Sequence, residues 1–489
     1  MIHSPILLVI FLVPIILTII LKPKQSKLPP GPKTWPIIGH LHLLGDKPHR
    51  SITNLSKIHG PIMSLKLGSV TTIVISSSKL AKEMFLNHDL ALSGRHVPVG
   101  GKCANHDKLS VGWLPVCTEW RNLRKILTLH LFTSKQLEAS QGIRQGKVRE
   151  LVEHTKECRE RGRKMDVGQV VFTTSINVLS NTLFSIDLAT YDDGCLNPQG
   201  FKAPLWEFWE QAGKSNLSDV FPLVESLDLQ GLARKIEACS GKIIGIFEEI
   251  IEQRLRDPYT IKGDGLDSFL QLVQENELSL ESVKHLLFDL FIAGTATTST
   301  ATEWAMTELL RHPEKMAKAQ AEIDQVIGKN GSIQEYDIPK LGYIQAVVKE
   351  TLRLHPPSPF LLPHKAEKDV QLGGYLVPKN AQIWVNVWWI GRDPSVWTNS
   401  DSFIPERFLD TKIDAKGRDF DFIPFGEGRR ICLGMPLAYR IMHLILANLI
   451  YLFNWKIDDG VDPNDIDVEE KFGITLQRAQ PLQVIPLFR

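Results

Sequence analysis

Apolar and polar positions follow helical and strand periods in different parts of the chain. A strand pattern covers residues 62–67 and 70–75, with a Gly-Ser turn between them. From about residue 79 to 316 the apolar positions recur mostly with the 3.6-residue period of a helix, and a second strand pattern covers residues 383–389. No internal repeat or low-complexity run interrupts this order. We therefore expect one large, mainly α domain with a minor β portion.

The chain begins with a long apolar run. Residues 5–21 contain no charge, and Lys22, Lys24 and Lys27 follow directly. Seventeen residues is the short end of the about 17–25 needed to cross a bilayer. A signal peptide would carry its charges before the apolar run and a small-residue cleavage site after it. We expect residues 1–21 to be a transmembrane helix, with the following chain in the cytosol by the positive-inside rule. The alternative is a buried core element.

Residues 22–32 are basic and rich in proline, including the segment Leu-Pro-Pro-Gly-Pro at 28–32. Such a sequence does not suit the interior of a helix or a strand. It predicts a stiff linker between the membrane anchor and the body of the protein. The expected organisation is therefore an anchor at 1–21, a linker at 22–32 and one catalytic domain at 33–489.

Composition narrows the class of protein. The 56 Lys+Arg and 55 Asp+Glu give a net charge of +1, which argues against a nucleic-acid-binding protein. With 43% hydrophobic and 23% charged residues, the chain is folded rather than disordered. The six cysteines stand singly with no C-x-x-C, which excludes a zinc ribbon and a disulfide scaffold.

The segment FGEGRRICLG at 425–434 carries the clearest chemistry. Its three glycines allow the backbone to approach a flat ligand closely, because they lack a Cβ. Cys432 precedes an apolar helical pattern at 435–452, where the free N–H groups and the helix dipole favour a thiolate. A lone cysteine is more often a small buried hydrophobe, which is our interpretation of the other five.

This segment resembles the heme-binding loop of the cytochrome P450 superfamily of heme-thiolate monooxygenases, whose pattern is F-x-x-G-x-R-x-C-x-G. Phe425, Gly428, Arg430, Cys432 and Gly434 fill the pattern. The resemblance implies heme b (iron protoporphyrin IX), with Cys432 as the axial ligand of the iron and Arg430 paired with a heme propionate. In this family the thiolate ligand favours cleavage of the O–O bond.

Two further motifs follow the order of the family. Glu350 and Arg353 lie at i, i+3 on one face of a predicted helix; alone, such a pair is an ordinary solvated salt bridge. By resemblance they form a structural triad with Arg407 of the segment Pro-Glu-Arg-Phe. The resemblance also places three more residues at the heme propionates: Trp120, Arg124 and His364.

The predicted long helix at 279–311 contains the segment AGTATTST at 293–300. Glycine and so many hydroxyl residues are poor choices for a helix interior, so a functional site is expected there. The alternative is close helix packing through small residues. The family pattern (A/G)-G-x-(D/E)-T-(T/S) assigns oxygen activation to Thr297 and Thr298, but Ala296 stands at the acidic position. Asp289 lies two helical turns from Thr297, too far for a direct proton relay.

Short segments at 61–65, 106–110 and 303–306 are similar to plant microsomal P450 enzymes related to geraniol 8-hydroxylase and ferruginol synthase. The resemblance implies hydroxylation, with O2, of a small apolar plant metabolite, a monoterpenoid or diterpenoid, in terpenoid biosynthesis and secondary metabolism. It places six residues at the substrate: Val111, Phe291, Ala293, Phe360, Leu361 and Ile474. They are apolar, as a hydrophobic pocket requires, although core packing is the common role of any one such residue.

Other functions stay open. Ala296 keeps open a heme-thiolate isomerase, dehydratase or lyase that needs no external electrons. A hydroxylase of phenylpropanoids or flavonoids and a non-catalytic heme-binding or lipid-binding membrane protein are further alternatives.

No flavin or nicotinamide fingerprint is visible in the sequence, so a monooxygenase needs an electron-donating partner. The family implies membrane-bound NADPH–cytochrome P450 reductase at the endoplasmic reticulum, with the catalytic domain on the cytosolic side. Four basic residues flank the heme motifs and are candidates for docking: Arg121, Lys125, Arg429 and Arg440.

Overall fold

The computed structural model describes residues 28–192, 200–257, 261–328, 331–457 and 462–489. The predicted anchor at 1–21 lies outside these ranges. Within them, one helix, α18 (Met435–Leu452), is long and apolar enough to cross a bilayer, but it packs in the hydrophobic core of the protein. The described cysteines, which exclude Cys195, are all free, as the sequence predicts.

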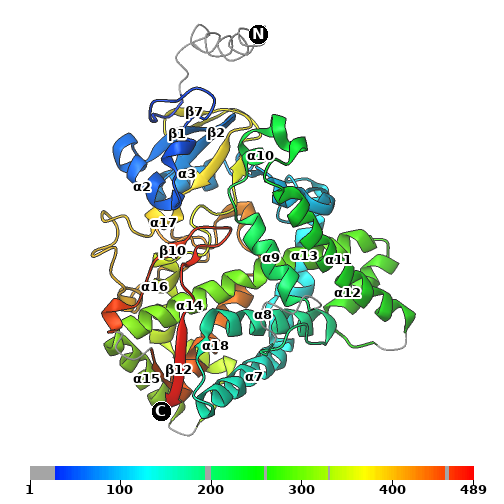
Figure 1. Ribbon diagram of the computed structural model, residues 1–489, viewed down its shortest axis with the longest axis vertical. Coiled ribbons are helices and arrows are strands. Elements are labelled where there is room, and N and C mark those ends of the chain that lie inside the picture. The colour runs from blue at the N-terminus through cyan, green and yellow to red at the C-terminus, as the bar shows by residue number, and fades with distance from the viewer. Residues whose placement is uncertain (1–27, 193–199, 258–260, 329–330, 458–461) are drawn as a thin grey trace, which may run out of the picture.

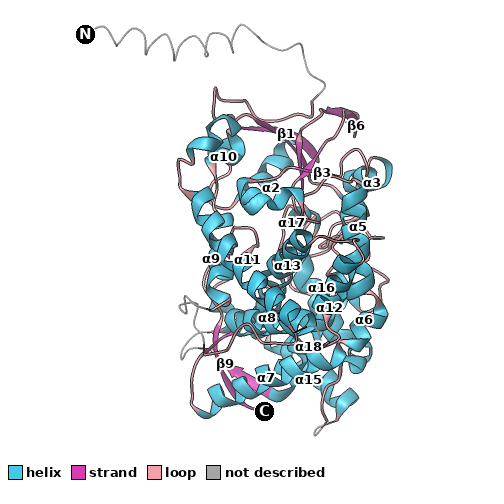
Figure 2. Ribbon diagram, turned by 90° about the vertical axis from the view of Figure 1, so that its right-hand side faces the viewer, coloured by secondary structure: helices cyan, strands magenta, loops and turns pink. Residues whose placement is uncertain are grey.

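Helices form most of the structure (Figures 1 and 2). The remaining helices are α2 (Pro48–His59), α3 (Ser78–Asn87), α4 (Val99–Lys102), α5 (Thr118–Leu127), α6 (Ser134–Ala139), α7 (Gln141–Glu160), α8 (Val167–Phe184), α9 (Lys202–Ala212), α10 (Leu217–Val220), α11 (Leu232–Arg256), α12 (Gly265–Gln274), α13 (Leu280–Gly294), α14 (Ala296–Arg311), α15 (Pro313–Ile327), α16 (Gly342–Leu354) and α17 (Val387–Ile390). Short 3-10 turns connect several of them.

The strands are few and mostly short, so the predicted fold class, mainly α with a minor β portion, is confirmed. They are β1 (Ile62–Leu67), β2 (Val70–Ile75), β3 (Gly94–Arg95), β4 (Met165–Asp166), β5 (His364–Lys365), β6 (Val370–Leu372), β7 (Tyr375–Val377), β8 (Gln382–Val385), β9 (Phe453–Lys456), β10 (Glu470–Lys471), β11 (Gln477–Arg478) and β12 (Gln483–Phe488). The largest sheet has the order β1-β2-β8-β5-β3 and lies at one end of the molecule (Figure 1).

The predicted hairpin is confirmed, since β1 and β2 pair antiparallel from Ile62↔Ile75 to Leu67↔Val70. The predicted strand at 383–389 is only half right. β8 ends at Val385, and the side chain of Asn386 accepts a hydrogen bond from the N–H of Trp389, which caps the short helix α17. This capping bond turns the chain away from the sheet.

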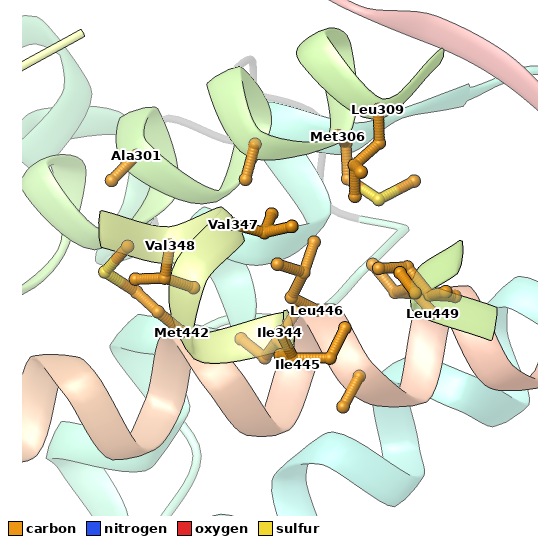
Figure 3. Packing of buried hydrophobic residues seen from close by; sticks show 14 of the residues in the cluster. Ala301, Met306, Leu309, Ile344, Val347, Val348, Met442, Ile445, Leu446 and Leu449 are labelled. Carbon is orange, nitrogen blue, oxygen red and sulfur yellow. The ribbon is translucent and has the colours of Figure 1, made fainter. Parts of the chain in front are cut away.

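The largest hydrophobic cluster joins α14, α16 and α18, as Figure 3 shows. Ala301 and Met306 of α14, Val347 of α16 and Ile445 and Leu446 of α18 are among its buried members. All three helices carry a predicted motif at or just beyond one end, so the core fixes the relative positions of those motifs. A second cluster packs α13 against side chains of α8, α9, α11 and α12.

Candidate functional site

The loop before α18 presents the predicted iron ligand. Gly426 and Gly428 have φ of +70° and +67°, a left-handed conformation that favours glycine. A Cβ on Gly428 would also lie 2.5 Å from Oδ1 of Asp89. The N–H of Cys432 donates to the carbonyl of Phe425 over 3.1 Å, which closes the loop. The glycines therefore set the path that brings Cys432 to the start of the helix.

The Cys432 side chain is accessible although protein surrounds it, as expected for a thiol that lines a space within the fold. Burial raises the pKa of this thiol above its ordinary value, while the N–H groups of Gly434 and Met435 and the charge of Arg124 act in the opposite direction. The helix terminus thus favours the thiolate, as predicted, but desolvation outweighs it in the protein alone. A bound metal ion would deprotonate the ligating thiol.

A group of cations lies beside this loop. The strand pair β3/β5 places Arg95 directly opposite His364. The guanidinium of Arg430 lies 4.6 Å from the ring centre of Trp120, and that of Arg124 lies 5.6 Å from the same ring. Each predicted propionate partner therefore lies beside another cation or beside the indole of Trp120. Arg95 was missed by the sequence analysis, because a two-residue strand carries no motif.

Among the described residues, this group of cations has no carboxylate in direct contact, and burial and mutual repulsion lower the pKa values of its members. Burial, followed by repulsion from Arg124, lowers the pKa of Arg430 to about 10. Burial and the charges of Arg430 and Arg124 lower the pKa of Arg95. Burial and Arg95 lower the pKa of His364. No carboxylate in the described ranges forms an ion pair with the three arginines, whose hydrogen bonds go to the carbonyls of Ser93, Val111, Gly112, Leu114, Leu362 and Ile431.

The predicted long helix is interrupted at Thr295, where α13 ends and α14 begins. The hydroxyl of Thr297 donates to the carbonyl of Ala293 over 2.6 Å, and that of Thr298 donates to Gly294 over 3.2 Å. Such bonds from hydroxyls to the preceding turn bend helices. Ala293 is exposed and Thr297 is half-buried, although neighbouring positions of the same helices are buried. At the break, the face of α13 and α14 that carries Ala293 and Thr297 is therefore accessible.

Ala296 is the first residue of α14 and is 2% exposed. It belongs to the second apolar cluster, which also contains side chains of α5, α8 and α12. The missing carboxylate is therefore replaced by apolar packing at this position. Asp289, the nearest acid considered from the sequence, bonds elsewhere: its carboxylate accepts from the hydroxyl of Ser110 and the N–H of Val111.

The predicted triad forms in the interior. Glu350 accepts Nε of Arg353 at 2.6 Å and Nε of Arg407 at 3.0 Å, and both Glu350 and Arg353 have fully buried side chains. The carboxylate also accepts the N–H of Ile404 at 2.7 Å. Arg353 donates to the carbonyls of Ser400 and Ser402. These contacts tie α16 to the segment that leads to the cysteine loop.

Two of the predicted substrate residues lie buried among aromatic side chains. The ring of Phe291 is fully buried and packs against Phe184, Phe201 and Phe247, at 5.9, 4.9 and 5.3 Å between ring centres. Phe360 is 6% exposed and stacks on Trp384 at 5.0 Å. Both are core residues, because aromatic neighbours from distant segments cover them.

The other predicted substrate residues keep accessible surface. Val111, Leu361 and Ile474 are half-buried, and Ala293 is exposed. Leu361 has φ of +58°, and a Cβ on Gly426 would lie 3.5 Å from its side chain, so it adjoins the cysteine loop. The backbone N of Ile474 packs against Gly213 at the end of α9. Four of the six residues therefore keep surface that a substrate could reach.

The arrangement fits a heme. An accessible thiol lies at the start of α18, α14 packs against that helix, and the break exposes Ala293 and Thr297. The cations without a carboxylate partner suit the two propionate groups of a porphyrin. Buried like charges are costly without a counter-ion, so an anionic ligand explains why they gather.

Comparison with known proteins agrees with this site. Residues 29–485 match the family described as Cytochrome P450. Cytochrome P450 monooxygenase 76AD131 of Lophophora williamsii is 53% identical over 95% of this chain and 93% of its own length. Geraniol 8-hydroxylase of Catharanthus roseus is 48% identical over 95% and 94%. A solved zebra fish cytochrome P450 with progesterone has a TM-score of 0.77 and 26% identity, covering 90% of this chain and 99% of that one.

The family match spans nearly the whole chain, and the alignments with the two named monooxygenases cover more than nine tenths of both chains. Heme is the cofactor of the family, and its members use O2 and a redox partner. The chain belongs to the cytochrome P450 family and is a heme-dependent monooxygenase with terpenoid hydroxylases among its relatives.

Proposed function

We propose that this enzyme hydroxylates a small apolar terpenoid, a monoterpenoid or diterpenoid, with electrons from NADPH delivered by NADPH–cytochrome P450 reductase. The single observation that carries the proposal is the 48% identity to a geraniol 8-hydroxylase over nearly the full length of both chains. The apolar candidates Val111, Leu361 and Ile474 support it, because a hydrocarbon substrate gains from an apolar lining.

In this proposal Cys432 binds the iron of heme b, and five residues hold its propionates: Arg95, Trp120, Arg124, His364 and Arg430. Phe425, Gly428 and Gly434 shape the loop that carries the thiolate. The heme supplies the activation of O2 and the transfer of one oxygen atom to the substrate. Glu350, Arg353 and Arg407 hold the loop segment in place and touch no reactant.

The substrate class is tested with the full-length holoenzyme, reductase and NADPH. Geraniol represents the terpenoids, and cinnamic acid and naringenin represent the phenylpropanoids and flavonoids. We expect a spectral shift of the heme on binding and a hydroxylated product with geraniol or a diterpene. Turnover of the aromatic substrates alone would contradict the terpenoid proposal and favour the phenylpropanoid or flavonoid alternative.

Thr297 is proposed to bring protons to the oxygen site through its hydroxyl, aided by Thr298. Thr297 is half-buried, its hydroxyl donates to the carbonyl of Ala293, and Ala296 removes the usual acidic partner. General acid–base assistance is typically worth about 10²–10⁴-fold in rate. We therefore expect Thr297→Val to lower the product formed per NADPH severalfold and to raise peroxide release, whereas the packing of the isosteric side chain stays intact.

The same measurement on Ala296→Asp tests the missing acid. A carboxylate there would enter an apolar cluster, which raises its pKa, but it would also lie in the first turn of α14, where the helix dipole favours negative charge. We expect Ala296→Asp to form more product per NADPH than the parent enzyme.

Unchanged product per NADPH in Thr297→Val would contradict the proton relay and favour an isomerase, dehydratase or lyase.

The reductase is proposed to dock beside α5. A shallow hollow of about 340 Å³ is lined there by Trp120, Arg121, Arg124, Lys125, Thr128, Leu129 and Arg429. Arg121 and Lys125 are exposed and, within the described ranges, lack an ion-pair partner, whereas Arg429 pairs with Asp89 and Arg440 with Glu335. The unpaired cations of α5 are therefore the better candidates.

Reversing the charges of Arg121 and Lys125 to Glu should slow reduction of the heme by reductase about tenfold at low salt, because complementary charges mainly speed encounter. The difference should shrink as salt is added. The matched control reverses two exposed arginines of α11, Arg234 and Arg256. Equal reduction rates in the two double variants would contradict docking at α5.

A single-pass anchor at residues 1–21 is proposed to hold the domain on the cytosolic face of the endoplasmic reticulum. Exposed apolar side chains support membrane contact at one end of the domain: Trp35, Ile37, Leu223, Leu227 and Leu229. They flank the β1–β2 turn, since Gly39 bridges to Leu67 and Ser69 donates to the carbonyl of Val220. Release of the full chain from microsomes by an alkaline wash would contradict the anchor.

A further inference from the structure

Asp289 of α13 has no part in the proton route, yet its carboxylate is fully engaged. It accepts the hydroxyl of Ser110 at 2.6 Å, the N–H of Val111 at 2.7 Å and Nε2 of His106 at 3.1 Å. The side chains of Asp289 and His106 are 14% and 5% exposed. Bonds to a carboxylate in such a setting are stronger than neutral ones. Asp289 of α13 therefore holds the loop around Val111, which lies 178 residues earlier in the chain.

A second histidine extends this contact. Nδ1 of His106 lies 2.9 Å from Nδ1 of His285, one turn before Asp289 on α13. Because His106 donates its Nε2–H to the carboxylate, its Nδ1 is the acceptor when the ring is neutral, and His285 donates. Burial and His106 lower the pKa of His285, consistent with a neutral ring. Nε2 of His285 lies 3.4 Å from Oε1 of Glu281, so the polar contacts run from Glu281 through His285 and His106 to Asp289.

The ring of His106 also packs against the helices. Phe288 of α13 meets it edge-on at 4.9 Å between ring centres and meets Phe208 of α9 at 5.3 Å. The loop is thereby locked to α13 and, through Phe288, to α9. The backbone before His106 is strained, since Ala104 and Asn105 have φ of +48° and +57°. Strain of this kind persists only where surrounding contacts enforce it.

The far side of Val111 is fixed as well. Its carbonyl accepts the indole N–H of Trp120 at 3.0 Å, and Nη1 of Arg430 lies 3.5 Å away. Val111 therefore lies between the carboxylate of Asp289 on α13 and two proposed propionate partners, Trp120 and Arg430. Its half-buried side chain is one of the substrate candidates. A shift of this backbone would therefore change the substrate pocket.

We propose that Asp289, with His106 and His285 behind it, is a positioning residue that fixes residues 106–114 and so sets the shape and tightness of the substrate pocket at Val111. This inference rests on the proposed substrate site. Asp289 acts through the loop and touches no reacting atom. Its loss should weaken ligands that reach the loop and spare small ligands of the iron.

The test uses the full-length holoenzyme and two changes of unequal size. Asp289→Asn removes the charge and leaves one acceptor oxygen for three donors; Ser110→Ala removes a single bond. The control is Asp107→Asn, the same chemical change in the same loop, where the described part of the chain provides no hydrogen-bond partner for the carboxylate. The reduced carbon monoxide spectrum checks that each variant holds heme.

We expect amide exchange in residues 103–114 to speed up about tenfold in Asp289→Asn and severalfold in Ser110→Ala, as losing charged hydrogen bonds predicts. The dissociation constant of 4-phenylimidazole should rise by about the same factors, and that of imidazole should stay within about twofold. Asp107→Asn should match the parent.

Unchanged exchange and unchanged 4-phenylimidazole affinity in heme-bound Asp289→Asn would overturn the inference. If that variant fails to bind heme, Ser110→Ala decides by the same two readings. Both readings are independent of the natural substrate. Failure of geraniol or a diterpene to turn over would therefore contradict the proposed substrate class and leave the positioning role to be judged on these readings.

Discussion

Replacing Cys432 by alanine should abolish the thiolate-type spectrum of the reduced carbon monoxide complex and all NADPH-dependent turnover. The cysteine loop presents an accessible thiol at the start of α18. The sulfur of Cys117 also lies near Arg430, but it accepts the N–H of Trp120 at the start of α5. Cys103, Cys158 and Cys239 are buried. No second sulfur is therefore placed to take over the iron.

The variant Cys432→His tests the ligand more specifically, because it should change the type of the spectrum and not only abolish it. An imidazole at this position should bind the iron and convert the spectrum to that of an imidazole complex, while the loop and its left-handed glycines stay in place. Cys117→Ser is the matched control, because Cys117 is a partly buried cysteine that caps α5. A thiolate-type spectrum in Cys432→His would contradict the ligand assignment.

Glu350→Gln should destabilise the fold by about 3–5 kcal/mol, the usual cost of removing one partner of a buried ion pair. Two guanidinium groups, one of them fully buried, would lose their carboxylate. We expect most of the purified chain to lack heme, because α16 would no longer hold the segment before the cysteine loop. Urea unfolding and the heme absorbance per chain measure the two effects.

The matched control is Glu153→Gln on α7, which removes an exposed i, i+3 pair with Lys156. Such surface pairs are worth about 0–1 kcal/mol, so heme content should be normal. Equal stability of the two variants would show that the buried triad is not a support of the fold.

The parts of the site that were predictable from sequence are local or tied to a fixed motif. The cysteine loop and the helix after it are continuous in sequence, and spacing alone places Glu350 and Arg353 on one helix face. The run of small and hydroxyl residues marks the functional segment of the predicted helix at 279–311, although the structure interrupts that helix at Thr295. In each case neighbouring residues determine the local structure.

Contacts between distant segments could not be predicted from the sequence. Phe291 lies on the predicted helix, but Phe184, Phe201 and Phe247 decide which face of that helix is buried. Arg95 comes to the cations only because β3 pairs with β5. The role of Asp289 depends likewise on a loop far away in the chain. The hydrophobic period and the spacing of motifs carry no information about contacts between residues far apart in the sequence.

The most direct test of the central claim is the source of the oxygen in the product. The full-length holoenzyme is incubated with geraniol, reductase, NADPH and isotopically labelled O2, and the product is analysed by mass spectrometry. We predict a hydroxylated product that carries one labelled oxygen atom and forms only when both NADPH and reductase are present. A product that forms without NADPH, or that carries no label, would contradict a monooxygenase and support an isomerase, dehydratase or lyase.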